Sequence, residues 1–152
     1  MPDVAKGQSP LKNHLLAALP EAELKLLIPK LEPVSLKLGQ VIYEAGDGMA
    51  YAYFPTTAIM SLLYVMQNGG TAEIGVIGND GLLGVSAFLG GGAMPHRAVI
   101  QSAGEATRMK ISDLKEAFAR GDVFQDILLR FTQALMTQIS QTAVCNRLHS
   151  VE

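Results

Sequence analysis

The spacing of apolar residues changes twice along the chain and divides it into three parts. Between residues 13 and 31, leucines recur at roughly helical intervals. Residues 34–111 instead carry short β-branched and aromatic segments separated by glycines. From residue 112 onward the spacing is helical again. The pattern therefore predicts short helices, then a β body, then a second helical part.

The first part reads as two short helices behind a polar lead. Residues 1–12 are predicted to be a flexible lead. Asn13 is a suitable N-cap for a helix over residues 14–19, because asparagine side chains accept the unpaired amides of a first helical turn. Pro20 can open a second helix over residues 21–31.

The middle part is predicted to be a compact all-β unit. Asn68-Gly69-Gly70 is a strong hairpin signal, whereas the glycine-rich residues 81–95 interrupt the strand pattern. Short strands with frequent turns are typical of a sandwich, a jelly roll or a small barrel. The expected strands cover residues 34–38, 40–45, 50–54, 59–66, 71–77, 96–101 and 106–111.

The third part reads as a short helix followed by a long one. Ser112 is a candidate cap for the short helix, which Gly121 is placed to end. Asp122, with Gln125 three residues later, approaches a capping box at the start of the second helix. Since no breaker follows, this helix is predicted to reach Glu152 and to be about 46 Å long, at ~1.5 Å per residue.

The long helix is apolar on two faces, which favours a partner. One face can cover the β body of the same chain, and a second copy of the helix would cover the other. The alternative is a helix buried in a larger core. The helix also lacks a stop signal, so we expect the natural protein to continue beyond Glu152. The predicted homodimer interface consists of Leu128, Phe131, Leu135, Ile139 and Thr142.

Composition restricts the class of protein. Apolar residues make up 49% and charged residues 17%, which indicates a globular domain rather than a disordered chain. The net charge of −2 gives no general attraction to nucleic acid, so a DNA-reading part would lie elsewhere. The single cysteine, Cys145, excludes an internal disulfide and a four-thiolate cluster. Without a signal region or a membrane-length apolar run, a cytoplasmic protein is expected.

Four segments resemble the Crp/Fnr transcription regulators in order and spacing. They are LKLGQVIYEAGD at 36–47, YFP with IMSL at 53–62, GVIGNDGLLG at 75–84, and DILLRF at 126–131. The resemblance covers residues 13–152. It implies a mainly β fold with flanking helices: a cyclic-nucleotide-binding-like, double-stranded β-helix jelly roll over residues 13–121 and a dimerisation helix over 122–152. It also implies a helix-turn-helix domain beyond this chain, with DNA and RNA polymerase as partners of the full-length protein.

The resemblance also implies a ligand pocket, but this sequence departs from the cyclic-nucleotide pattern. In the family, a glycine precedes a glutamate that holds the ribose, and a short helix offers amides to the phosphate. The glycine here is Gly81 or Gly84, and the following residue is Leu82 or Val85, so the acid is missing. The pattern's threonine that faces the base falls on Thr142.

The arginine that pairs with the phosphate is also out of place. Its position falls on His96, and the adjacent Ser/Thr position falls on Arg97. Arg97 would serve only after a one-residue slip, which turns a strand side chain to the other face unless a bulge near Gly104 restores it. A charge-assisted hydrogen bond is worth roughly 1.5–3 kcal/mol, so its loss weakens phosphate binding about tenfold or more.

We therefore expect a ligand sensor that is not a standard cyclic-AMP receptor. The ligand is left open: a cyclic nucleotide, another small anion, an unidentified molecule, or no ligand in a pocket filled by its own side chains. The side chains expected to fill it are Leu82, Leu83, Val85, Phe88 and Leu89.

Two other classes of protein compete with this interpretation. A cupin-like metal enzyme would need a histidine and carboxylate cluster, which the three histidines do not supply, and we predict no catalytic residue and no metal site. A cyclic-nucleotide-binding module of a kinase or channel would be expected to retain the acid and the arginine.

Overall fold

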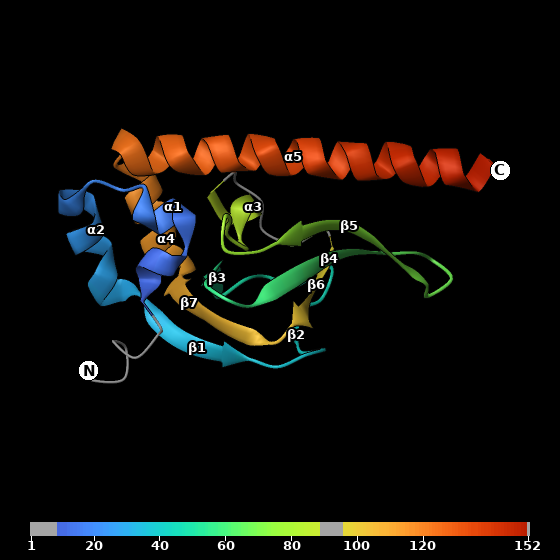
Figure 1. Ribbon diagram of the computed structural model, residues 1–152, viewed down its shortest axis with the longest axis horizontal. Helices are drawn as coiled ribbons and strands as arrows, with labels where there is room; N and C mark the ends of the chain where they lie inside the picture. Colours follow the sequence, from blue (N-terminus) through green and yellow to red (C-terminus); the bar gives the residue numbers. More distant parts are fainter. Residues whose placement is uncertain (1–8, 89–95, 152) are drawn as a thin grey trace.

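The computed structural model describes residues 9–88 and 96–151, with side chains for residues 9–87 and 96–142 (Figure 1). Its helices are α1 (His14–Ala17), α2 (Glu21–Leu27), α3 (Val85–Phe88), α4 (Ile111–Ala119) and α5 (Asp122–Val151), with 3-10 turns at Pro10–Lys12 and Ile28–Lys30. Its strands are β1 (Glu32–Leu36), β2 (Val41–Tyr43), β3 (Tyr51–Pro55), β4 (Ile59–Val65), β5 (Thr71–Ile77), β6 (Arg97–Ser102) and β7 (Gly104–Lys110). The predicted order of helices, strands and helices is confirmed.

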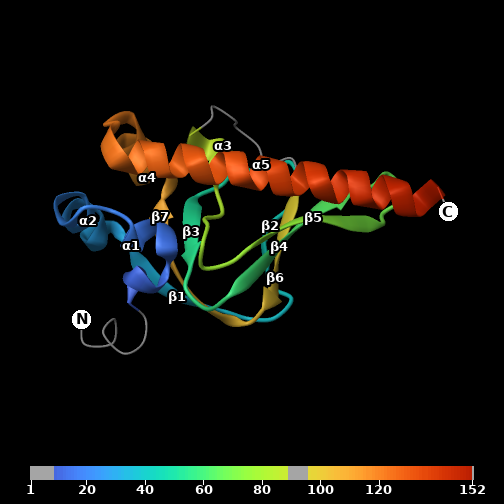
Figure 2. The same ribbon diagram turned by 45° about the horizontal axis from the view of Figure 1, so that its top comes forward.

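The strands form two antiparallel sheets that roll around a common interior. One sheet has the order β1-β7-β3 and the other β2-β6-β4-β5. The two short helices, α4 and the start of α5 gather at one end of the roll, and α5 then runs along its side past β5 (Figure 2). The expected jelly roll with flanking helices and a long last helix is therefore confirmed.

Asn13 caps α1 as predicted, and it also joins three parts of the chain. Its side-chain oxygen accepts from the amides of Leu15 and Leu16, at 3.1 and 3.3 Å. Its amide nitrogen donates to the carbonyls of Pro55 and Gly81, at 2.8 and 2.9 Å. The residue is fully buried. All the hydrogen-bonding capacity of one side chain thus holds α1, the end of β3 and the Gly81 segment together.

The start of α4 differs from the prediction, whereas α5 begins at Asp122 as predicted. Helix α4 begins at Ile111 directly after β7, so Ser112 lies inside it rather than at its cap. The capping box at Asp122 is not formed, because the Gln125 side chain donates to the Phe118 carbonyl instead. Glu23 of α2 accepts the Phe124 amide in the first turn of α5, at 3.2 Å. A carboxylate from α2 therefore caps the first turn of α5. Gly121, with φ of +79°, ends α4 as predicted.

Two apolar clusters make up the core, and α5 contributes to both. One lies among the N-terminal helices, α4 and the start of α5, and the other fills the roll. Leu128 belongs to the first, Leu135 to the second, and Phe131 packs against both. The helix is therefore part of the same folded body. None of the described helices is long and apolar enough to cross a membrane.

Candidate functional site

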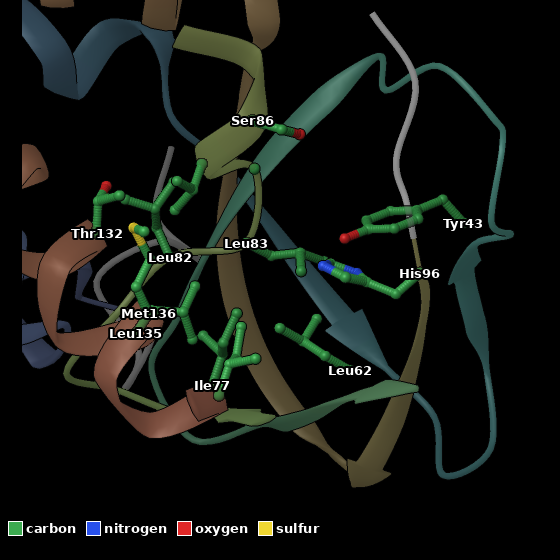
Figure 3. Close-up of a pocket in the computed structure, with 13 residues that line it drawn as sticks. Tyr43, Leu62, Ile77, Leu82, Leu83, Ser86, His96, Thr132, Leu135 and Met136 are labelled. Carbon is green, nitrogen blue, oxygen red and sulfur yellow. The ribbon is translucent and has the colours of Figure 1, made fainter. Parts of the chain in front are cut away.

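A cavity of about 160 Å³ lies between the roll and α5 (Figure 3). Strand residues form one side of it, the segment around α3 forms a second, and α5 forms the third. Most of the lining is apolar. The lining residues are Tyr43, Leu62, Ile77, Leu82, Leu83, Gly84, Val85, Ser86, His96, Thr132, Leu135, Met136 and Ile139.

The segment before α3 is held against β3, and this fixes the floor of the cavity. Tyr53 and Leu83 exchange two backbone hydrogen bonds, of 2.9 and 2.8 Å. Gly84 has φ of +132°, and a Cβ atom there would lie 3.0 Å from that of Ala52. Because L side chains rarely adopt such a backbone and the space is closed, glycine is needed at this turn. Leu82 and Leu83 are thereby buried beside the cavity.

Gly81 sets the distance between this segment and α5. A Cβ atom at position 81 would lie 2.6 Å from Cζ of Phe131, closer than side-chain carbons approach. The Phe131 ring therefore sits directly on the Gly81 backbone, and α5 comes closer to the roll than a residue with a side chain would allow.

The structure brings together only part of the predicted ligand-binding set. Leu82, Gly84, Val85 and His96 line the cavity. Gly81 packs under Phe131 instead. Arg97 and Thr142 do not line the cavity either. The glycine and histidine positions implied by the resemblance thus surround this pocket, whereas the guanidinium does not.

Arg97 is engaged elsewhere. Its Nε donates to Oε1 of Glu44 at 2.6 Å. A bulge near Gly104 does occur: β6 carries one extra residue, Gln101, because Ile59 pairs with Ser102 whereas Met60 pairs with Ile100. It does not bring Arg97 into the pocket, since Arg97 does not line the cavity. His96, directly before β6, does line it.

The described lining carries no carboxylate, amine or guanidinium group. Its two ionisable side chains are Tyr43 and His96, and burial keeps both neutral. Desolvation raises the pKa of the Tyr43 hydroxyl and lowers the pKa of the His96 imidazole, with a backbone hydrogen bond opposing the latter shift. The cavity is therefore uncharged at neutral pH.

The sequence interpretation missed several lining residues, of which Tyr43 carries the most chemistry. The Tyr43 hydroxyl and Nδ1 of His96 are buried, and neither has a hydrogen-bond partner among the described residues. In Figure 3 the Tyr43 hydroxyl points toward the His96 ring. Tyr43 is the buried last residue of β2, and the neighbouring Ile42 also packs against the core, so no clean alternation marked Tyr43 in the sequence. Thr132, by contrast, is satisfied by the Leu128 carbonyl at 2.8 Å.

The predicted dimer residues lie on the face of α5 that packs on the same chain. Leu128 is fully buried and Leu135 is 8% exposed, so neither offers a free surface in this structure. Phe131 and Ile139 are partly buried against the core, and Thr142 is half-buried. The dimer and its contact residues stay a prediction.

Two further predictions concern side chains that fill the pocket and side chains that could bind a metal ion. Leu82, Leu83 and Val85, expected to fill the pocket, do line it. The side chain of Phe88 lies outside the described part of the structure. Leu89 lies outside the described residues. No group of three histidine, cysteine, aspartate or glutamate side chains suited to a metal ion occurs within the described part of the chain.

The chain resembles known proteins both in sequence pattern and in fold. A family model described as the cyclic nucleotide-binding domain matches residues 33–121. No curated protein sequence matches the chain. Among solved structures, the N-terminal domain of a transcriptional regulator from Streptomyces coelicolor A3(2) superposes with a TM-score of 0.62 at 19% identity, over 88% of this chain and 94% of that one.

Two further structures are much longer than this chain. The catabolite activator protein of Thermus thermophilus gives a TM-score of 0.64 at 18% identity, over 90% of this chain and 62% of that one. The regulatory subunit of a cAMP-independent protein kinase A from Trypanosoma brucei gives 0.70 at 17%, over 83% and 45%. The chain therefore spans less than two thirds of either protein, and at these identities the likeness concerns the fold.

Proposed function

Because the chain belongs to the cyclic nucleotide-binding domain family, we propose that it is the ligand-sensing and dimerising part of a bacterial Crp/Fnr-type transcription regulator. Its role is regulatory rather than enzymatic. DNA, and RNA polymerase with it, is contacted through a domain outside these residues, in the cytoplasm. The match to the N-terminal domain of a Streptomyces regulator over 94% of that domain supports this assignment.

The observation that carries the proposal is the position of α5 as one wall of the cavity. Leu135, Met136 and Ile139 line it from the helix side. A molecule that enters the roll therefore contacts the helix directly. Helix α5 is 30 residues long and extends past the roll, so a shift at the cavity is carried to its far end (Figure 1). A sensor that reports through its last helix needs such a contact.

The sensor is not a standard cyclic-AMP receptor. A cyclic phosphate needs a cation or several amides to replace its water, and burying it beside neutral side chains is unfavourable. The described lining supplies no cation, and Arg97 is paired with Glu44 outside the cavity. The acid that would hold a ribose is replaced by Leu82 or Val85, both of which line the cavity. These features support recognition of something other than cyclic AMP.

A second copy of α5 is the proposed dimer partner, but it meets a line different from the one the sequence suggested. Leu129 and Met136 lie seven residues apart and are 43% and 61% exposed. That spacing places them on one stripe, the pattern by which two helices pack along a common seam. Leu128 and Leu135 meanwhile hold the helix to its own roll. One apolar face of α5 thus packs on its own roll, and the other is available to the partner helix.

Substitution of Leu129 tests the dimer. We expect the wild-type chain to have twice its monomer mass of 16.2 kDa by light scattering at high micromolar concentration. Leu129→Glu is expected to weaken association by about tenfold or more, because an unpaired carboxylate would be buried in the seam. Leu26→Glu is the matched control, since Leu26 is 56% exposed on α2, away from this face. A monomeric wild type, or equal effects of both substitutions, would contradict the proposed dimer.

A regulatory module of a kinase is the second candidate function. It is favoured by the TM-score of 0.70 to the Trypanosoma brucei kinase subunit, which is described as cAMP-independent. A similar subunit from Trypanosoma cruzi is described as bound to guanosine, a nucleoside without a phosphate. The uncharged cavity agrees with either candidate. Association through the Leu129 stripe would favour the transcription regulator, and a monomer would favour the kinase-type module.

A further inference from the structure

We propose that the cavity between the roll and α5 binds a small, neutral, largely apolar molecule that carries one hydroxyl group and is about the size of a single-ring phenol. This inference rests on the proposed sensor function and names the chemical class of its ligand. It follows from the volume of the cavity, the nature of its walls and the two polar atoms that they leave unpaired.

The volume sets the size of the molecule. The cavity measures about 160 Å³. An engineered apolar cavity of about 150 Å³ takes up benzene, whereas pockets for larger ligands run from roughly 300 to 1,000 Å³. A single ring or a short branched chain therefore fits the existing space, and a whole nucleotide would require the walls to move.

The walls set the polarity of most of the molecule. The apolar walls come from β4 and β5, from the segment before α3 and from α5, and include Leu62, Ile77, Leu82, Leu83 and Leu135. Burial of carbon against such walls is favourable by roughly 25 cal/mol per Å² of apolar surface. The described lining offers no charge to balance an ion, so the favoured ligand is neutral.

The polar end of the molecule is set by Tyr43 and His96. Both belong to the roll, and both have a buried polar atom without a partner among the described residues, the hydroxyl of Tyr43 and Nδ1 of His96. A buried unsatisfied group costs about 1–3 kcal/mol. The neutral imidazole can accept at Nδ1 when Nε2 carries its hydrogen, and the tyrosine hydroxyl can donate.

A hydroxyl group matches this pair because one oxygen both donates and accepts. The ligand hydroxyl would accept from Tyr43 and donate to Nδ1 of His96, which satisfies both atoms at once. A hydrocarbon of the same shape would fill the cavity but leave both atoms unpaired. A phosphate or carboxylate would place a charge beside two neutral groups and find no cation. The pair therefore distinguishes a phenol or alcohol from its apolar and anionic counterparts.

The probes for the test are phenol and toluene, titrated calorimetrically into the 152-residue chain. We expect saturable binding of phenol at one site per chain. Tyr43→Phe is expected to weaken phenol binding about tenfold, which corresponds to ~1.4 kcal/mol, and to leave toluene binding within about twofold, since only a hydroxyl is removed. Tyr64→Phe is the matched control, because Tyr64 is 54% exposed and does not line the cavity.

Should Tyr43→Phe fail to fold, His96→Leu removes the other partner and is expected to give the same selective loss. Absence of saturable phenol binding would overturn the proposal, and so would phenol binding that neither substitution weakens. If phenol binding fails in either way but the wild-type chain is a dimer that Leu129→Glu disrupts, this ligand class is rejected and the sensor function stands. A monomeric chain would instead reject the transcription-regulator assignment in favour of the kinase-type module, whatever phenol does.

Discussion

Asn13→Ala is expected to lower the free energy of unfolding by about 3 kcal/mol or more, a large change for a side chain outside any ligand site. The substitution removes the cap of α1, worth ~1 kcal/mol, and leaves two buried carbonyls unpaired at about 1–3 kcal/mol each. These are the carbonyls of Pro55 and Gly81, 2.8 and 2.9 Å from the side-chain nitrogen. Urea unfolding measures the loss, and the midpoint of thermal unfolding should fall by roughly 10 °C.

Asn13→Asp separates two roles of the side chain: the cap of α1, and the brace formed by its hydrogen bonds to the Pro55 and Gly81 carbonyls. Aspartate can still accept from the first-turn amides, but it would place a carboxylate oxygen against the two carbonyl oxygens. We therefore expect a loss at least as large as for alanine. Asn68→Ala is the control. The Asn68 side chain accepts a single exposed hydrogen bond, from the Gly70 amide, so this substitution should cost less than about 1 kcal/mol. A tolerated aspartate at position 13 would show that the brace contributes nothing.

Gly81→Ala has the second large effect, expected at about 1–3 kcal/mol through overpacking. The new methyl group would overlap the Phe131 ring, with Cζ only 2.6 Å away. The ring packs against both core clusters, so moving it clear of the methyl group would disturb at least one of them. The clash therefore lifts α5 from the roll. Urea unfolding of the variant would show the lower stability.

Two further variants identify the cause. Gly78→Ala is the matched glycine control, because a Cβ atom there meets nothing within 4 Å, and its stability should hold or rise slightly. Phe131→Leu shortens the opposing side chain, so it should cost less in the Gly81→Ala background than in the wild type. If the losses in free energy of unfolding of Gly81→Ala and Phe131→Leu simply add in the double variant, the two positions do not interact.

The sequence predicted the local structure of this chain well because local chemistry determined it. Asn13 begins α1 as a side-chain cap, and Gly121, with positive φ, ends α4. Asn68-Gly69-Gly70 forms the expected turn, in which the Met66 amide donates to the Gly70 carbonyl at 2.8 Å. In each case the residue itself supplies the hydrogen bond or the conformation that the element requires.

Contacts between distant segments were beyond the sequence pattern. The cap function of Asn13 was predictable, but its bonds to Pro55 and Gly81 depend on how the roll closes. The seven-residue spacing identified an apolar line on α5. It did not show that Leu128 and Leu135 face the same chain, because a heptad pattern does not indicate which surface it meets.

The candidate site was predictable only where the family pattern is local. His96 was identified by counting back from Lys110, and it lines the cavity. Tyr43 was missed, because its role depends on β2 pairing with β6, where Tyr43 lies opposite Ala98. The fate of Arg97 was left open by the sequence, and the structure resolves it through the ion pair with Glu44. Both cases depend on how β2 and the residue after it lie against β6, which the sequence pattern does not show.

We propose that the pocket of this family member, whose described lining is uncharged, does not accept a cyclic phosphate. Calorimetric titration of the chain with cyclic AMP tests it most directly, with Arg97→Ala in parallel. We expect no saturable heat from either protein up to about 1 mM, since phosphate contacts worth roughly 1.5–3 kcal/mol each are missing. Binding of cyclic AMP at micromolar concentration with one site per chain, abolished by Arg97→Ala, would contradict the claim.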